Sequence, residues 1–141
     1  VVAVILILSM SIWNVSASRA RAAPSEAARV GGTGRLARMA IPEITVDELA
    51  ELLERGVPLI DVREPDEYAQ ARVPGAVLVP LGEVPDRLDT FDRDRTNYVI
   101  CARGGRSMRA CEIAAAQGYD VVNVAGGTLA WIDTGRPVEA G

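Results

Sequence analysis

The sequence predicts an α/β fold in which a central, mainly parallel β-sheet of about five strands carries helices on both faces. Short apolar, β-branched runs alternate with amphipathic segments from residue 42 onward. This alternation is typical of parallel strands joined by right-handed helical crossovers. A chain of 141 residues has the length of one domain and can bury a core. We therefore expect one domain over residues 41–141, preceded by a separate segment over residues 1–40.

The domain begins with a capped helix and a short buried strand. Thr45 and Glu48 have the spacing of a capping box, in which each side chain caps the other residue's backbone N–H. Apolar residues then recur at helical spacing until Gly56, which we expect to end the helix. Residues 58–62 form an apolar run and predict a strand that carries Asp61.

The middle of the domain contains a second helix, a second strand and a short helical segment. Pro65 precedes two acidic residues, a pattern that favours the start of a helix. The turn over residues 73–76 leads into a strand over residues 77–79. Residues 82–88 are amphipathic and predict one or two helical turns.

The last third of the chain repeats the strand–helix pattern. Residues 97–100 predict a strand, and residues 106–117 predict a helix that ends at Gly118. A further strand is expected over residues 119–124, and the glycines at 126–127 turn the chain into a last helix.

A cysteine stands where the strand over residues 97–100 ends, and parallel sheets bind ligands beyond that end of their strands. The next residues open a helix, whose first N–H groups lack intrahelical partners and bind anions. Glycine lets the backbone approach a ligand closely, and arginine charge favours a thiolate. We therefore predict that Cys101 is a nucleophile. The residues expected to bind its substrate are Ala102, Arg103, Gly104, Gly105, Arg106 and Ser107.

Composition excludes several kinds of site. The chain contains neither His nor Lys, so all 15 basic residues are arginines. Cys–His and Ser–His nucleophilic pairs and His-containing metal sites are therefore excluded. We expect no metal and no organic cofactor. Acidic residues outnumber arginines beyond residue 38, which argues against nucleic acid as a partner.

The second cysteine, Cys111, falls inside the predicted helix that follows the Cys101 loop. A helix rises about 1.5 Å per residue, so a direct disulfide would require the start of this helix to unwind. We expect Cys111 to be a small buried apolar residue rather than a resolving thiol.

The first forty residues allow three interpretations. Residues 1–15 are apolar, but a signal peptide would carry basic residues before them. A membrane anchor would need about 20 apolar residues, and arginines after it would hold the domain in the cytoplasm. The third interpretation is an upstream extension, with natural translation starting at Met39 and residues 16–38 disordered. We expect a cytoplasmic protein without membrane association, with the anchored form as the alternative.

Several ordered motifs, taken together, resemble the rhodanese (sulfurtransferase) family, and the likeness extends over residues 42–138. The stretches that carry it are residues 59–68, 73–76, 101–107 and 118–121, with Gly126, Gly127 and Trp131. The resemblance implies a single-domain rhodanese-like fold. It also implies an enzyme that moves a sulfane sulfur through a persulfide on Cys101.

The resemblance further implies the partners and the supporting residues. The sulfur donor would be a small anion, thiosulfate or a persulfide, and the acceptor a thiol, a cyanide-like nucleophile or a protein sulfur carrier. Family enzymes that use thiosulfate well often carry a basic residue near the position of Glu67. The acidic residue here argues against thiosulfate as the physiological donor. Asp61 would be the acid that braces Arg106, and Arg63 would support the same scaffold.

Two other functions remain open at this point. A phosphatase of the same fold has five residues between its cysteine and its arginine, whereas only four separate Cys101 from Arg106. A rhodanese-like module that only binds partners typically lacks the cysteine. Persulfide loading of Cys101 distinguishes this second alternative from the enzyme.

Overall fold

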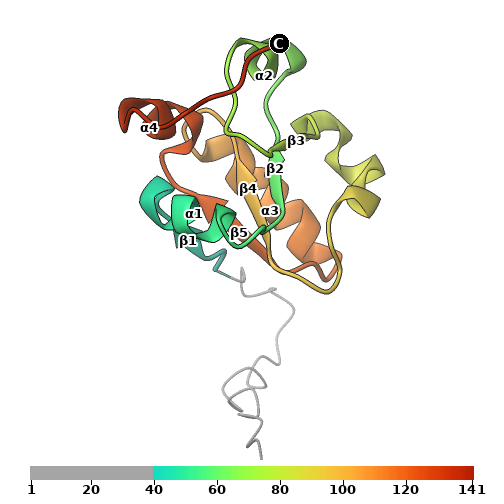
Figure 1. Ribbon diagram of the computed structural model, residues 1–141. Coiled ribbons are helices and arrows are strands. Elements are labelled where there is room, and N and C mark those ends of the chain that lie inside the picture. Colours follow the sequence, from blue (N-terminus) through green and yellow to red (C-terminus); the bar gives the residue numbers. More distant parts are fainter. Residues whose placement is uncertain (1–39) are drawn as a thin grey trace, which may run out of the picture. The chain divides into compact units, whose positions relative to one another are not determined.

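The computed structural model describes residues 40–141, which contain a five-stranded sheet in the order β1-β5-β4-β2-β3 (Figure 1). Every neighbouring pair of strands is parallel, which confirms the predicted α/β class. The strands are β1 (Glu43–Ile44), β2 (Leu59–Asp61), β3 (Val77–Leu78), β4 (Asn97–Ile100) and β5 (Val121–Val124).

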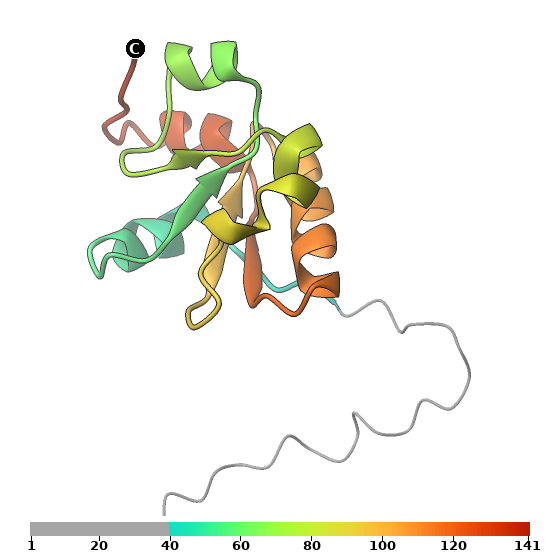
Figure 2. The same cartoon turned by 90° about the vertical axis from the view of Figure 1, so that its right-hand side faces the viewer.

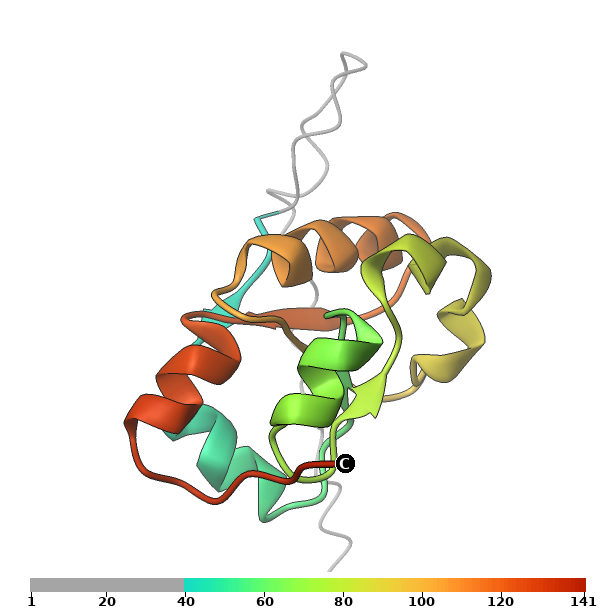
Figure 3. The same ribbon diagram turned by 90° about the horizontal axis from the view of Figure 1, so that it is seen from above.

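Helices cover both faces of this sheet. Helices α1 and α4 lie on one face, and α3 lies on the other together with the 3-10 helices η2 and η3 (Figure 3). Helix α2 follows β2 and stands at one end of the sheet (Figures 1 and 2). The helices are α1 (Val46–Leu53), α2 (Pro65–Gln70), η2 (Leu81–Asp86), η3 (Leu88–Thr90), α3 (Gly105–Ala116) and α4 (Gly127–Asp133).

The predicted capping box starts α1. The backbone N–H of Thr45 donates to the Glu48 carboxylate at 2.7 Å, and the N–H of Glu48 donates to the Thr45 hydroxyl at 3.2 Å. Helix α1 then buries Val46 and Leu49 against the sheet. Gly56 lies in the turn after the helix with φ 73°, a conformation that favours glycine.

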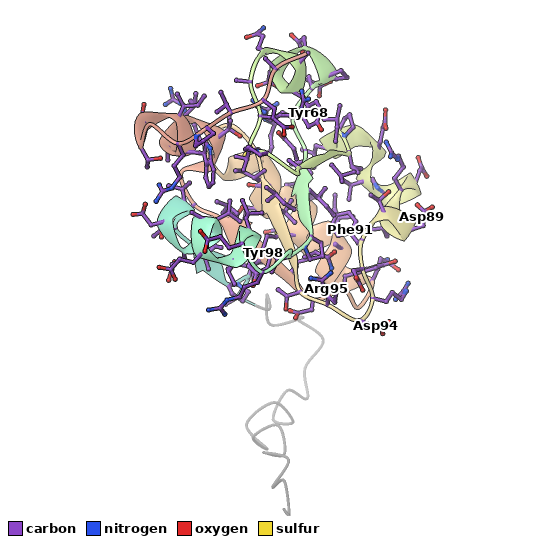
Figure 4. The ribbon with its side chains drawn as sticks, in the orientation of Figure 1. Tyr68, Asp89, Phe91, Asp94, Arg95 and Tyr98 are labelled. Carbon is purple, nitrogen blue, oxygen red and sulfur yellow. The ribbon has the colours of Figure 1, made fainter. Side chains whose placement is uncertain are left out.

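Side chains of each strand alternate between two apolar layers, one on each face of the sheet. Leu59 packs in the layer beneath α1 and α4, and its neighbour Ile60 packs in the layer beneath α3. Trp131 belongs to the first layer, and Tyr119 to the second. Tyr119 meets Phe91 edge to face, with ring centroids 5.7 Å apart (Phe91 is labelled in Figure 4). Trp131 and Tyr119 are therefore packing residues of the core.

The structure differs from the predicted elements in three places. Sequence periodicity missed strand β1, because two residues are too few to show alternation. Strand β5 begins at Val121 rather than at residue 119, because the N–H of Tyr119 donates to the carbonyl of Ala114 in the turn that ends α3. The helical turns expected over residues 82–88 are 3-10 helix, and Pro85 lies inside them.

The interpretations of the N-terminal segment fall on residues 1–39, which lie outside the described residues. The boundary at residues 40–41 therefore stays a prediction. Within residues 40–141, every helix is too short or too polar to cross a membrane.

Candidate active site

The loop that begins at Cys101 joins the carboxyl end of β4 to the start of α3. Gly104 caps α3 with φ 113°, a left-handed conformation that a residue with a side chain rarely adopts. The chain therefore turns sharply after the cysteine, and the backbone around Gly104 folds back toward the sulfur. The predicted strand–Cys–glycine turn–helix arrangement is confirmed.

The sulfur of Cys101 is held by donors from its own loop. Cys101 is 2 % exposed, and its Sγ accepts a hydrogen bond from the N–H of Gly104 at 3.1 Å. The hydroxyl oxygen of Ser107 lies 3.3 Å from the same Sγ. Burial alone raises the pKa of Cys101. Hydrogen bonds from the Ser107 hydroxyl and from the N–H groups of Ser107, Gly104 and Arg103 outweigh burial and bring that pKa below its ordinary value.

Helix α4 supports the outer side of this loop. The N–H of Thr128 donates to the carbonyl of Cys101 at 2.8 Å, and the N–H of Leu129 donates to the carbonyl of Ala102 at 3.1 Å. Gly127 brings α4 this close, because a Cβ there would lie 2.4 Å from the Cys101 carbonyl oxygen. The predicted turn at residues 126–127 is confirmed, but sequence reasoning missed its contact with the loop. The signal was a pair of glycines at the end of the strand next to β4.

The two loop arginines have different surroundings. Arg106 forms a bidentate ion pair with Glu67 of α2, at 2.7 and 2.8 Å. The prediction that Asp61 braces Arg106 is therefore wrong. The physical reason is that α2 carries Glu67 over the loop, whereas Asp61 is buried beside Arg63. Arg103 is exposed, and its side chain has no hydrogen bond or ion pair with residues 40–141.

Asp61 and Arg63 form a buried ion pair at the carboxyl end of β2. The Asp61 carboxylate is fully buried and accepts from the Arg63 guanidinium at 2.7 Å. The same guanidinium donates to the carbonyls of Glu67, at 3.4 Å, and Ala71, at 2.8 Å. Tyr68 adds a second anchor for α2, because its hydroxyl donates to the carbonyl of Ala76, just before β3. Tyr68 is labelled in Figure 4. Arg63 thus links Asp61 to α2, the helix that carries Glu67.

Loss of this buried pair should destabilise the domain. Asp61→Ala removes the carboxylate and leaves the Arg63 charge buried with carbonyl partners only. We expect the free energy of unfolding to fall by about 3 kcal/mol, measured by chemical denaturation. Glu83→Ala is the matched control, because it removes the exposed pair with Arg87 and should cost less than about 1 kcal/mol. Equal losses in the two variants would contradict the assignment.

The Glu67–Arg106 pair should give a characteristic dependence of stability on pH. The hydrogen bond from Arg106 is the main cause that lowers the pKa of Glu67 from 4.5 to about 2. A carboxylate with a depressed folded-state pKa stabilises the fold above its unfolded-state pKa, and this contribution is lost as the pH falls. The difference in stability between wild type and Glu67→Gln should therefore shrink between pH 4.5 and about pH 2. A difference that stays constant in pH-dependent unfolding would show that the pair does not form in solution.

Cys111 lies on α3 and is fully buried in the layer beneath that helix. Burial is the first cause that raises its pKa, to about 12. Both cysteines are free thiols in the structure. The expectation of a buried, apolar Cys111 is confirmed.

Sequence reasoning also missed Asn123, which reaches the site from β5. Its side-chain oxygen accepts from the Ser107 hydroxyl at 2.5 Å, and its amide nitrogen donates to the Gly104 carbonyl at 3.2 Å. Asn123 is 1 % exposed. The available signal was an asparagine within an otherwise apolar strand, where a buried amide needs hydrogen-bond partners.

Comparison with known proteins agrees with this architecture. The Rhodanese-like domain family matches residues 45–134. The Bacillus subtilis protein named "Putative sulfurtransferase YtwF" is 40% identical over 101 residues, covering 70% of this chain and 98% of that protein. A crystal structure of a rhodanese-like domain protein from Staphylococcus aureus has a TM-score of 0.66 and 39% identity, covering 72% of this chain and 99% of that one.

A further relative is matched over only about half of its length. The Bacillus subtilis protein named "Putative sulfur carrier protein YrkF" is 36% identical over 94 residues, which make up 64% of this chain and 51% of that protein. The chain thus spans about half the length of that relative. The family match, the fold and these identities lead to one conclusion: this chain belongs to the rhodanese-like domain family.

Proposed function

We propose that this protein is a sulfurtransferase in which Cys101 carries the sulfur as a persulfide. The observation that carries the proposal is the set of hydrogen-bond donors around the Cys101 sulfur, because they lower its pKa without a histidine base. The sulfurtransferase name of the relative that is 40% identical supports it.

The transfer occurs in two displacement steps. The Cys101 thiolate attacks the outer sulfur of thiosulfate, the new S–S bond forms, and sulfite leaves with the electron pair of the broken bond. With a persulfide donor, the leaving group is the donor's thiolate. A nucleophilic acceptor such as cyanide then attacks the outer sulfur of the Cys101 persulfide, giving thiocyanate and restoring the Cys101 thiolate. No oxidant or reductant is consumed.

The loop and its neighbours have separate roles in this scheme. The N–H groups at the start of α3 stabilise the anionic outer sulfur. Arg103 is exposed and meets an anionic donor at the surface, whereas Arg106 and Glu67 hold the loop in position. The relative named as a sulfur carrier supports a protein thiol or carrier as the natural acceptor.

The two alternatives have less support. The phosphatase loop has five residues between its cysteine and its arginine, whereas Cys101 and Arg106 are separated by four, and Arg106 is held by two hydrogen bonds to Glu67. A module that only binds partners has no use for a buried cysteine with a lowered pKa. We therefore place sulfur transfer first.

Steady-state kinetics test the proposal. Sulfur transfer to cyanide should proceed with thiosulfate and with a low-molecular-weight persulfide, and double-reciprocal plots should be parallel, as a ping-pong mechanism requires. Hydrolysis of an aryl phosphate under the same conditions should stay at background. Phosphate release without thiocyanate formation would instead favour the phosphatase.

A further inference from the structure

A chain of hydrogen bonds links β1 to the Cys101 sulfur through two buried side chains. The Asn123 amide donates to the Glu43 carboxylate at 2.9 Å, and the Asn123 oxygen accepts from the Ser107 hydroxyl at 2.5 Å. That hydroxyl oxygen lies 3.3 Å from Cys101 Sγ. Ser107 and Asn123 are 0 % and 1 % exposed, so solvent does not supply alternative partners. The state of the sulfur is therefore coupled to these two side chains.

The orientation of the Asn123 amide is set by its neighbours. Its nitrogen donates to two acceptors, the Glu43 carboxylate and the Gly104 carbonyl. If the amide were turned over, its oxygen would face both of these acceptors and two hydrogen bonds would be lost. The side-chain oxygen of Asn123 must therefore face Ser107.

Ser107 has only one hydroxyl proton for two acceptors. The hydroxyl donates either to the Asn123 oxygen or to a thiolate at Cys101, because both lie within hydrogen-bond distance. When Cys101 is a thiol, its S–H can donate to the Ser107 oxygen while the hydroxyl proton stays with Asn123. When Cys101 is a thiolate, the hydroxyl proton turns to the sulfur, and the bond to Asn123 is lost.

We propose that Asn123 is a positioning residue that competes with the Cys101 sulfur for the Ser107 hydroxyl proton and thereby favours the sulfur-loaded protein over the free thiolate. In the persulfide, the negative charge resides on the outer sulfur and Sγ is uncharged. The Ser107 hydroxyl can then donate to Asn123 again, and the loop N–H groups donate hydrogen bonds to the outer sulfur. The loading step of this inference rests on the proposed function, whereas the competition for the proton does not.

Among the other ionisable groups near Cys101, only Cys111, which is replaced in every variant, and Glu43, which loses the Asn123 hydrogen bond in Asn123→Leu, are altered in the test of this competition. Arg106, paired with Glu67 of α2, and Arg103 belong to the loop and the start of α3. Glu43 of β1 acts through Asn123. Cys111 lies on α3, and α4 carries a single ionisable residue, Asp133, at its far end.

The test is the pH dependence of Cys101 alkylation by iodoacetamide, measured on the full chain carrying Cys111→Ser. Asn123→Leu frees the Ser107 hydroxyl for the sulfur, so the midpoint of the Cys101 pH–rate profile should fall by at least about 0.3 pH units. Ser107→Ala removes the donor, so the midpoint should rise. The two neighbouring variants thus shift the profile in opposite directions.

A double variant isolates the competition from general disruption. In a Ser107→Ala background, Asn123→Leu should produce no further change in the alkylation profile, because no hydroxyl is left to compete for. A shift of both single variants in the same direction, or an unchanged profile in Asn123→Leu, would overturn the inference. If thermal melting shows that Asn123→Leu does not fold, Asn123→Ala replaces it with the same expected sign.

A second readout addresses loading and separates this inference from the proposed function. At a fixed ratio of persulfide donor to its thiol product, the loaded fraction of Asn123→Leu, measured by intact mass, should be lower than that of the Cys111→Ser parent. An unchanged loaded fraction would contradict the role in loading. If the parent itself takes up no sulfur, the proposed function fails, and the alkylation profiles still decide the competition for the proton.

Discussion

Replacement of Cys101 by serine should abolish sulfur transfer, whereas Cys111→Ser should retain most of it. The Cys101 sulfur lies at the carboxyl end of β4 among hydrogen-bond donors, and Cys111 is buried beneath α3 with its pKa raised to about 12. A thiol in that second environment is neither ionised nor accessible at neutral pH. The measurement is the steady-state rate of thiocyanate formation for the two variants and wild type.

The pair of variants serves as its own matched control, because each replaces a buried cysteine by the same residue. Thermal melting should show that both variants fold. Equal loss of activity in two folded variants would mean that Cys111 takes part in the reaction. Full activity in Cys101→Ser would remove the basis of the proposed function.

Gly127→Ala should be among the most destabilising single substitutions in the domain. Gly127 has φ 60°, and an added Cβ would lie 2.4 Å from the carbonyl oxygen of Cys101 and 2.6 Å from the backbone of Ala102. These neighbours are main-chain atoms of the cysteine loop, which cannot rotate away as the end of a side chain can. We expect the free energy of unfolding to fall by about 4 kcal/mol or more, seen as a decrease in Tm of roughly 10 °C or more.

Gly82→Ala is the matched control for this substitution. A Cβ at Gly82 meets nothing within 4 Å, and its backbone does not have a positive φ. The control should therefore melt close to wild type. A Gly127→Ala variant that melts with wild type would show that α4 does not pack against the cysteine loop in solution.

Local sequence patterns predicted most of the elements that position the site. The capping box at Thr45, the apolar run that became β4 and the glycine turn after Cys101 each depend on residues within a few positions of one another. Their physical causes, namely capping, alternation and left-handed glycine, act locally. These parts of the architecture could therefore be predicted from the sequence alone.

Partners that lie far apart in the chain could not be identified in this way. Glu67 and Arg106 are 39 positions apart, and Ser107 and Asn123 are 16 apart. The pairing depends on where α2 stands over the loop and on the register of β5 beside β4. The family resemblance assigned the acid that pairs with Arg106 to Asp61 of β2, whereas in the structure that acid is Glu67 of α2. Only the three-dimensional structure distinguishes these carboxylates.

Intact mass after incubation of the reduced protein with a sulfur donor tests the central claim most directly. Thiosulfate and a low-molecular-weight persulfide should be tried separately, followed by removal of excess donor. The account predicts an added mass of about 32 Da in wild type and in Cys111→Ser, with none in Cys101→Ser. A folded protein with a free Cys101 that gains no mass from either donor would contradict the account.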